Sequence, residues 1–268
     1  MTKAFASSMS STLRCLKVLE LLAEEPFELT LSDIAASLDA PRPTAHRFMM
    51  TLVEAGFAEQ DEKTKRYRLA SRSLWVGTGY LRHSPIYRAS FFPMQDLAKH
   101  APGTVQLGIR DGDHSVLFLH SVGYTGSPHA FADVGLRRPI HATATGKVLM
   151  SELPVAEVER IMATGREKHT ERTITSPQRM KQELTRVRQN GYALNNQELL
   201  PGYIVLAAPV RRRDGAIEAA ISLTLPVELC GPGKEAEYAG LVKEAARKIS
   251  LQLGFRLRAF TNPLARRS

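Results

Sequence analysis

The sequence predicts an α+β protein with two domains, and two patterns along the chain carry this prediction. In residues 11–70, apolar side chains recur mainly at helical spacing, and one short segment alternates as strands do. From residue 103 onward, alternating runs are joined by Asp-Gly turns and interrupted by helical segments. An antiparallel sheet with helices packed against it is the α+β arrangement. The length of 268 residues fits two domains, or one large one.

The composition is that of a soluble globular chain, with 43% hydrophobic and 24% charged residues. No apolar run approaches the roughly 18 residues of a membrane span, and the N-terminus lacks the apolar region of a signal peptide. Two cysteines are too few for a disulfide framework, so a reducing cytoplasm is the default. The net charge of +9 decides nothing about nucleic acid, because residues 1–70 hold 9 basic and 10 acidic side chains. Local placement of charge matters more.

Residues 1–25 are predicted to form a disordered N-terminal stretch followed by one helix. Residues 1–10 are small and polar and are expected to be disordered. A helix is predicted from Ser10 or Ser11 through Glu25, with apolar residues on more than one face. Such a helix is either deeply buried or offers a second face to a partner subunit. A dimer is the natural reason for such a second face.

Residues 30–56 have the pattern of two short helices joined by a tight turn. Thr30 or Ser32 can cap the first helix, and Asp39-Ala40-Pro41 ends it. The second helix restarts at Arg42 with a proline in its first turn, where proline is tolerated. The inward stripes of the two helices are formed by Leu31, Ile34, Ala35 and Leu38, and by Ala45, Phe48, Met49 and Leu52. The outward face of the second helix is basic at its N-terminal end, as a helix in the major groove requires.

Residues 57–69 follow at once and alternate around a polar tip, which predicts a β-hairpin. Helix, turn, helix and hairpin is the winged helix-turn-helix order. We predict base contacts from the second helix and backbone or minor-groove contacts from the hairpin. The predicted DNA-binding residues are Arg42, Pro43, Thr44, His46 and Arg47 on the helix and Lys63, Lys65 and Arg66 on the hairpin. The alternative is a plain helix pair followed by a surface hairpin.

The remaining elements are predicted in order. Residues 71–101 form two helical pieces broken near Ser84-Pro85, because proline disfavours helix at the preceding residue. Strands are expected at 104–110, 115–122, 192–197, 204–211 and 216–225. Helices are expected at 143–153, 157–164, 177–190 and 234–254, and residues 256–268 form a basic tail.

Several segments together resemble a known family. They are S-T-L-R-C-L-K-V-L-E-L-L-A, L-T-L-S-D-I-A-A-S-L, P-T-A-H-R-F-M-M-T-L-V-E-A-G-F, P-I-H-A-T-A-T-G-K-V-L-M-S and G-Y-A-L-N-N-Q-E-L-L-P-G-Y-I-V-L-A-A-P-V. In this order and spacing they resemble the IclR-type bacterial transcriptional regulators over residues 11–255. The resemblance implies a winged helix-turn-helix domain at 11–70, linker helices at 71–101 and a GAF-like effector-binding domain at 102–255. It also implies operator DNA, a small organic acid and a second copy of the chain, as a dimer or tetramer, as partners.

The run A-T-A-T-G-K-V is not a phosphate loop, because His141 and Val148 stand where that motif needs Gly and Ser or Thr. A helix starting near Thr143 can still offer its first amides to a carboxylate. The alternative is an ordinary helix capped by Thr143. The resemblance favours the first interpretation and implies an effector pocket formed by Thr143, Ala144, Thr145, Asn195, Tyr203, Val205 and Ser222, with Ala130 and Phe131 on the facing loop.

Two positions depart from the family pattern. Asn195 stands where the family has an acidic residue, and Val205 where it often has cysteine. A more neutral and apolar pocket follows, which suits an aromatic or hydrophobic carboxylic acid.

Catalytic chemistry is not predicted. The sequence has no metal-ligand spacing and no G-x-S-x-G, so no catalytic residue, metal or cofactor is assigned. The predicted function is a ligand-responsive transcription factor, repressor or activator, and not an enzyme. The alternative is a metabolic enzyme or a small-molecule-binding module without DNA activity.

Overall fold

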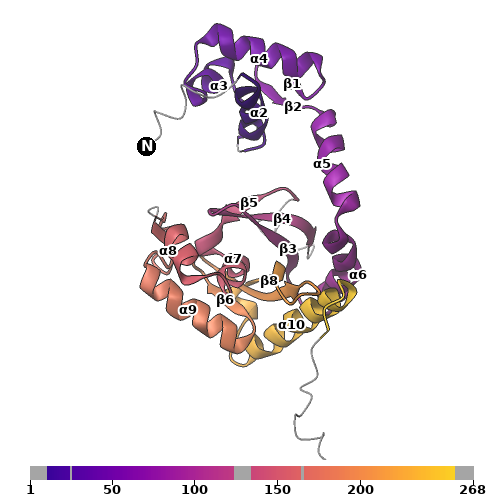
Figure 1. The fold of residues 1–268 in the computed structure, drawn as a ribbon, viewed down its shortest axis with the longest axis vertical. Helices are drawn as coiled ribbons and strands as arrows, with labels where there is room; N and C mark the ends of the chain where they lie inside the picture. The colour runs from indigo at the N-terminus through magenta and orange to yellow at the C-terminus, as the bar shows by residue number, and fades with distance from the viewer. Residues whose placement is uncertain (1–10, 25, 124–133, 164–165, 257–268) are drawn as a thin grey trace, which may run out of the picture. The chain divides into compact units, whose positions relative to one another are not determined.

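The computed structural model describes residues 11–24, 26–123, 134–163 and 166–256. The chain divides between His83 and Ser84 into two compact units, each drawn in Figure 1. The division falls inside the segment predicted as linker helices, because its first helix belongs to the N-terminal unit and its second to the C-terminal unit.

The N-terminal unit is a helix-turn-helix with a small two-stranded wing, as predicted. Its elements are α2 (Ser11–Leu22), α3 (Leu31–Ser37), α4 (Arg42–Glu54), β1 (Ala58–Gln60), β2 (Tyr67–Leu69) and α5 (Ser71–His83). Thr30 caps α3 in a reciprocal arrangement with Asp33, whose carboxylate accepts from the Thr30 amide at 2.9 Å. In the wing, Glu59 stands opposite Arg68. The predicted inward stripes are buried apart from Leu31, which is half-buried, and Ile34 and Met49 are fully inaccessible.

Helix α2 differs from its prediction. It ends at Leu22 rather than Glu25, and it buries Val18 and Leu22 against the other helices of the unit. Leu13 and Leu16 lie about half exposed on another side of the helix. Of the two predicted roles for this helix, the structure therefore favours a second apolar face that is open.

The C-terminal unit is a six-stranded antiparallel sheet with helices on both faces, which confirms the α+β prediction. Its strands lie in the order β5-β4-β3-β8-β7-β6. The elements are α6 (Pro85–His100), β3 (Thr104–Asp111), β4 (Ser115–Val122), β5 (Arg137–Pro139), η1 (Ile140–Ala142), α7 (Ala144–Met150), α8 (Val155–Ala163), α9 (Pro177–Asn190), β6 (Ala193–Asn196), β7 (Tyr203–Arg211), β8 (Ile217–Pro226), η2 (Val227–Leu229) and α10 (Lys234–Gln252).

The two faces of this sheet are covered by different helices (Figure 1). Helix α7 packs on β7 and β8 with α8 and α9 behind it, and the core on this side includes Ala207 and Ala220. Because side chains alternate along a strand, Leu206 and Ile221 point to the opposite face, where they are also fully buried. Helices α6 and α10 pack against the sheet and each other. The cavity discussed below lies on the α7 face.

Two elements of the C-terminal unit differ from their predictions. Helix α7 ends at Met150, three residues before the predicted end, and the Ser151 hydroxyl donates to the Val148 carbonyl at 2.7 Å at that point. Strand β5 was not predicted, because it has three residues and exists only by pairing with β4. Among the described residues, no helix combines the length and apolar character needed to cross a bilayer.

Candidate functional site

Helix α4 presents a buried stripe to its unit and an open face to solvent. Ala45 and Met49 are fully buried. Arg42, Pro43, His46 and Arg47 are exposed and Thr44 is half-buried. This split follows from the 3.6-residue period, which places the apolar residues on one side and the basic ones on the other. The five residues predicted to contact DNA from this helix lie within residues 42–47, and four of them are exposed.

No described part of the chain binds the basic side chains of this face. Among the described residues, the side chains of Arg42, His46 and Arg47 have no protein hydrogen-bond or ion-pair partner, and the same holds for Lys63 and Lys65 on the wing. Unpartnered, exposed cations exchange water for phosphate oxygens without losing an internal contact.

Two arginines of the wing are instead held by their own domain. The Arg66 guanidinium donates to the Glu28 carbonyl at 3.3 Å, and Arg68 pairs with Glu59 at 2.7 Å and with Glu28 at 3.4 Å. Arg66 was predicted to face DNA, and the structure places it half-buried with part of its donor capacity used. Lys63 and Lys65 are therefore the wing cations most available to a partner.

The wing tip has a fixed backbone. The Asp61 carboxylate accepts hydrogen bonds from the backbone amides of Lys63 at 3.0 Å and Thr64 at 2.7 Å. The hydrogen bond from the Thr64 amide is the main cause of the lowered pKa of Asp61. Lys65 has a φ of 57°, in the left-handed region that tight turns use. The two lysines are thus presented by an ordered turn.

The C-terminal unit contains a cavity of about 80 Å³ between the start of α7 and one face of the sheet. This exceeds the space that one water needs, so the cavity can hold a small molecule. Every predicted effector-site residue that the structure describes lines it: Thr143, Ala144, Thr145, Asn195, Tyr203, Val205 and Ser222. Ala130 and Phe131 lie outside the described residues.

Helix α7 reaches the cavity with its N-terminus. The Thr143 hydroxyl caps the helix and accepts from the Gly146 amide at 3.0 Å. The capped-helix interpretation of this run is therefore correct, and it does not exclude a ligand, because the first amides of a helix lack helical acceptors. Gly146 allows the close approach that places them, since a Cβ there would lie 1.9 Å from the Ile140 carbonyl oxygen.

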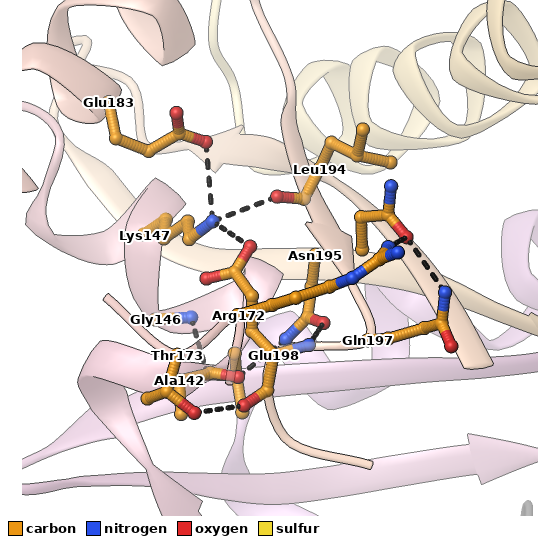
Figure 2. A network of polar contacts seen from close by, with 12 residues as sticks. Ala142, Gly146, Lys147, Arg172, Thr173, Glu183, Leu194, Asn195, Gln197 and Glu198 are labelled. Atoms are coloured by element: carbon orange, nitrogen blue, oxygen red, sulfur yellow. Dashed lines mark hydrogen bonds and ion pairs between the residues drawn. The ribbon is translucent and has the colours of Figure 1, made fainter. Parts of the chain in front are cut away.

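The polar groups of the cavity wall differ in how many hydrogen bonds they form with the rest of the protein. The Ser222 hydroxyl is fully buried and has no hydrogen-bond partner within the described residues. The Asn195 amide donates to the Ala142 carbonyl and accepts from the Glu198 amide at 2.9 Å (Figure 2). Asn195 therefore ties two backbone segments of the wall together, whereas Ser222 has hydrogen-bonding capacity left for a ligand.

Sequence reasoning missed part of the lining, namely Gln106, Phe118, Arg138, Leu199, Leu200 and Thr224. Arg138 matters most, because within the described residues its guanidinium has no protein partner, whereas neighbouring Arg137 pairs with Asp111 at 2.6 Å. The Arg-Arg-Pro sequence signalled positive charge here. Which arginine faces the cavity depends on strand β5, whose pairing the sequence did not reveal.

Two described histidines of this unit, His120 and His141, have structural contacts. His120 lies within 3.1 Å of the Ser90 hydroxyl, and burial lowers its pKa. His141 contacts the Glu167 carbonyl at 3.0 Å, and burial is the main cause of its lowered pKa. Within the described part of the chain, no three His, Cys, Asp or Glu side chains gather as metal ligands.

Comparison with known proteins agrees with this two-part architecture. Residues 11–62 match the family model of the IclR helix-turn-helix domain, and residues 78–251 match that of the bacterial transcriptional regulator IclR C-terminal domain. The glycerol operon regulatory protein of Streptomyces coelicolor is 35% identical over 251 residues, which cover 93% of this chain and 98% of that protein.

Two solved structures share the fold. A transcriptional regulator from Alicyclobacillus acidocaldarius has a TM-score of 0.82 at 24% identity, covering 92% of this chain and 100% of its own. An IclR homologue from Microbacterium hydrocarbonoxydans, solved in complex with 4-hydroxybenzoate, has a TM-score of 0.78 at 24% identity, covering 91% and 99%.

Proposed function

Since this chain belongs to the IclR family of DNA-binding bacterial transcriptional regulators, we propose that it binds operator DNA through α4 and the wing and that a small carboxylic acid in the cavity changes this binding. The family consists of regulators with a C-terminal effector-binding domain, not of enzymes.

The observation that carries the DNA-binding site is the row of exposed cations on α4 that no other group of the described chain binds. Arginine donors at the start of a recognition helix suit base edges and phosphates, and wing lysines suit the backbone or minor groove. The proposed contacts are Arg42, Pro43, Thr44, His46 and Arg47 from α4 and Lys63, Lys65 and Arg66 from the wing.

The cavity supports a carboxylate effector at one end and an apolar body at the other. The start of α7, the unpartnered Ser222 hydroxyl and the Arg138 guanidinium supply donors. Apolar surface comes from Phe118, Tyr203 and the other hydrophobic side chains of the lining. The proposed contacts are Thr143, Ala144, Thr145, Asn195, Tyr203, Val205 and Ser222, together with Ala130 and Phe131.

An aromatic or hydrophobic acid fits this lining better than a two-carbon acid does. Neutral Asn195 and apolar Val205 leave the wall without an acidic or thiol group at these positions. The complex of the Microbacterium relative with 4-hydroxybenzoate supports an acid of this size.

Self-association into a dimer or tetramer completes the proposal. Leu13 and Leu16 on α2 are exposed, and so are Leu74, Trp75 and Val76 on α5, with Trp75 at 64%. Apolar side chains gathered on two helices favour a protein partner. A second copy is the partner that lets two α4 helices read two half-sites. An operator-binding protein acts on the chromosome, which puts the proposed site of action in the cytoplasm.

Two titrations test the proposal. Fluorescence anisotropy with the promoter DNA of the protein's own gene is expected to show sequence-selective binding that changes when acid is added. Calorimetry with benzoate, 4-hydroxybenzoate, pyruvate and glyoxylate is expected to rank the aromatic acids first. Tighter binding of pyruvate or glyoxylate would contradict the aromatic preference. Turnover of an acid without selective DNA retention would favour the enzyme alternative.

A further inference from the structure

Lys147 is a fully buried lysine one turn into α7, and the structure gives its ammonium group three acceptors (Figure 2). Its Nζ donates to Glu198 Oε1 at 2.6 Å, to the Leu194 carbonyl at 2.9 Å and to Glu183 Oε1 at 3.2 Å. An ammonium group has three donors, so this lysine is fully satisfied. It is also too deep to serve as a surface charge.

The three acceptors belong to three different parts of the fold. Glu183 lies on α9, Leu194 on β6, and Glu198 on the segment 197–202 between β6 and β7. That segment also carries Leu199 and Leu200, which line the cavity. Lys147 therefore connects the helix whose start forms one side of the cavity to the segment that forms another side.

Segment 197–202 is held near Glu198 from several directions. The Thr173 hydroxyl donates to the Glu198 carbonyl at 2.6 Å, and the Glu198 amide donates to the Asn195 side chain at 2.9 Å. Asn195 itself lines the cavity. Through Asn195, the hydrogen bonds of Glu198 thus reach the cavity wall.

Stability alone does not explain the Lys147–Glu198 pair. Burial raises the pKa of Glu198, an effect that nearby Lys147 opposes, and Glu198 Oε2 is buried without a partner in the described residues. A buried ion pair is often no more stabilising than apolar side chains of similar volume. What apolar side chains cannot supply is a directional bond that fixes where the segment lies.

We propose that Lys147 and Glu198 are positioning residues for ligand binding, because their buried pair holds segment 197–202 against α7 and so sets the shape of the cavity wall. This inference rests on the proposed effector site and assigns to it two residues that do not line the cavity. Glu183 binds the same ammonium group but lies on α9, outside the wall. It therefore offers a matched control.

The first test compares Glu198→Gln with Glu183→Gln by calorimetry, using benzoate as the probe. Each substitution removes one negative charge beside Lys147 and keeps the side-chain shape. The affinity of Glu198→Gln is expected to fall about tenfold or more, a difference of about 1.4 kcal/mol, and that of Glu183→Gln to change much less. Equal losses in both variants would overturn the positioning role.

A double substitution separates position from stability. Lys147→Met with Glu198→Leu replaces the pair by apolar side chains and is expected to restore the melting temperature relative to either single variant. Benzoate affinity is expected to stay reduced in the double variant. If affinity returned together with the melting temperature, the pair would be a stability element only.

Hydrogen exchange in the ligand-free protein tests the same inference without any acid. Glu198→Gln is expected to raise exchange at the amides of segment 197–202 selectively, and Glu183→Gln to leave that segment unchanged. Exchange that rises uniformly over the C-terminal unit in both variants would overturn the inference. If wild type binds no benzoate while exchange changes locally, the acid proposal fails and the positioning role stands.

Discussion

The outer face of α4 and the cavity beside α7, which are the two proposed binding sites, differ in kind. On α4 the predicted contact residues come from one continuous segment, are mostly exposed and keep their cations unpartnered within the described chain. The cavity is lined from β3, β4, β5, α7, β6, β7, β8 and the segment between β6 and β7, and groups such as Asn195 are bonded on two sides.

The difference follows from the partners that the two sites suit. A phosphate backbone is met by mobile cations that keep their hydration until contact, so DNA affinity depends on local charge. A small molecule is held by a preformed shape, so affinity for it depends on packing around the cavity. Substitutions on the two surfaces are therefore expected to behave differently, and three comparisons test this.

The largest effect is expected from Gly146→Ala at the start of α7. Its Cβ would meet the Ile140 carbonyl oxygen at 1.9 Å, and backbone cannot swing aside as a side chain does. The free energy of unfolding of the C-terminal unit, measured by urea denaturation, is expected to fall by about 3 kcal/mol or more.

Gly240→Ala in α10 is the matched control for this substitution. A Cβ at Gly240 meets nothing within 4 Å, so the helix is expected to gain about 0.5–1 kcal/mol. Similar changes in the free energy of unfolding for both substitutions would show that close packing at Gly146 does not shape the cavity.

Arg47→Ala on α4 is expected to act on DNA and not on folding. If Arg47 touches a base, specific operator binding weakens by about 1–3 kcal/mol, with an unchanged melting temperature. Arg212→Ala, at the exposed turn between β7 and β8, removes the same charge and serves as the control. Unchanged operator affinity in Arg47→Ala would assign Arg47 to the helix surface.

The wing allows a finer comparison between an unpartnered cation and a partnered one. Lys63→Ala is expected to lower the slope of log affinity against log salt by about 1, equally for all DNA sequences. Arg68→Ala is expected to change it less, because Arg68 already pairs with Glu59 and Glu28. Salt titrations of both variants measure this, and equal slopes would show that the internal ion pairs do not matter.

The smallest effect is expected from pH through His120. Burial lowers the pKa of His120 from its ordinary value of 6.5. The His120 side chain therefore binds a proton more weakly in the folded protein than in the unfolded chain. The contribution of neutral His120 to the free energy of unfolding is therefore complete above pH 6.5. It is lost as the pH falls from there through the pKa of the folded state. Buried His141 acts in the same direction.

His120→Gln is expected to flatten the dependence of unfolding free energy on pH between 7.5 and 5. His100→Gln is the control, because the His100 side chain is 63% exposed. A slope that stays the same in His120→Gln would show that another group causes it.

The sequence by itself determined the helix-turn-helix, its wing and the cap of α7. These depend on contacts between residues close in the chain: the stripe from Ala45 to Leu52, the polar hairpin tip, and Thr143 three residues before the amide it binds. The family resemblance added the cavity residues on β6, β7 and β8.

Only the tertiary structure decided the rest of the site. Strand β5 exists by pairing with β4, and that pairing places Arg138 at the cavity and Arg137 beside Asp111. The burial of Lys147 between α9, β6 and the segment before β7 joins residues 36 to 51 positions apart in the sequence. Local patterns show which face of an element is apolar, but they do not show which distant group that face will meet.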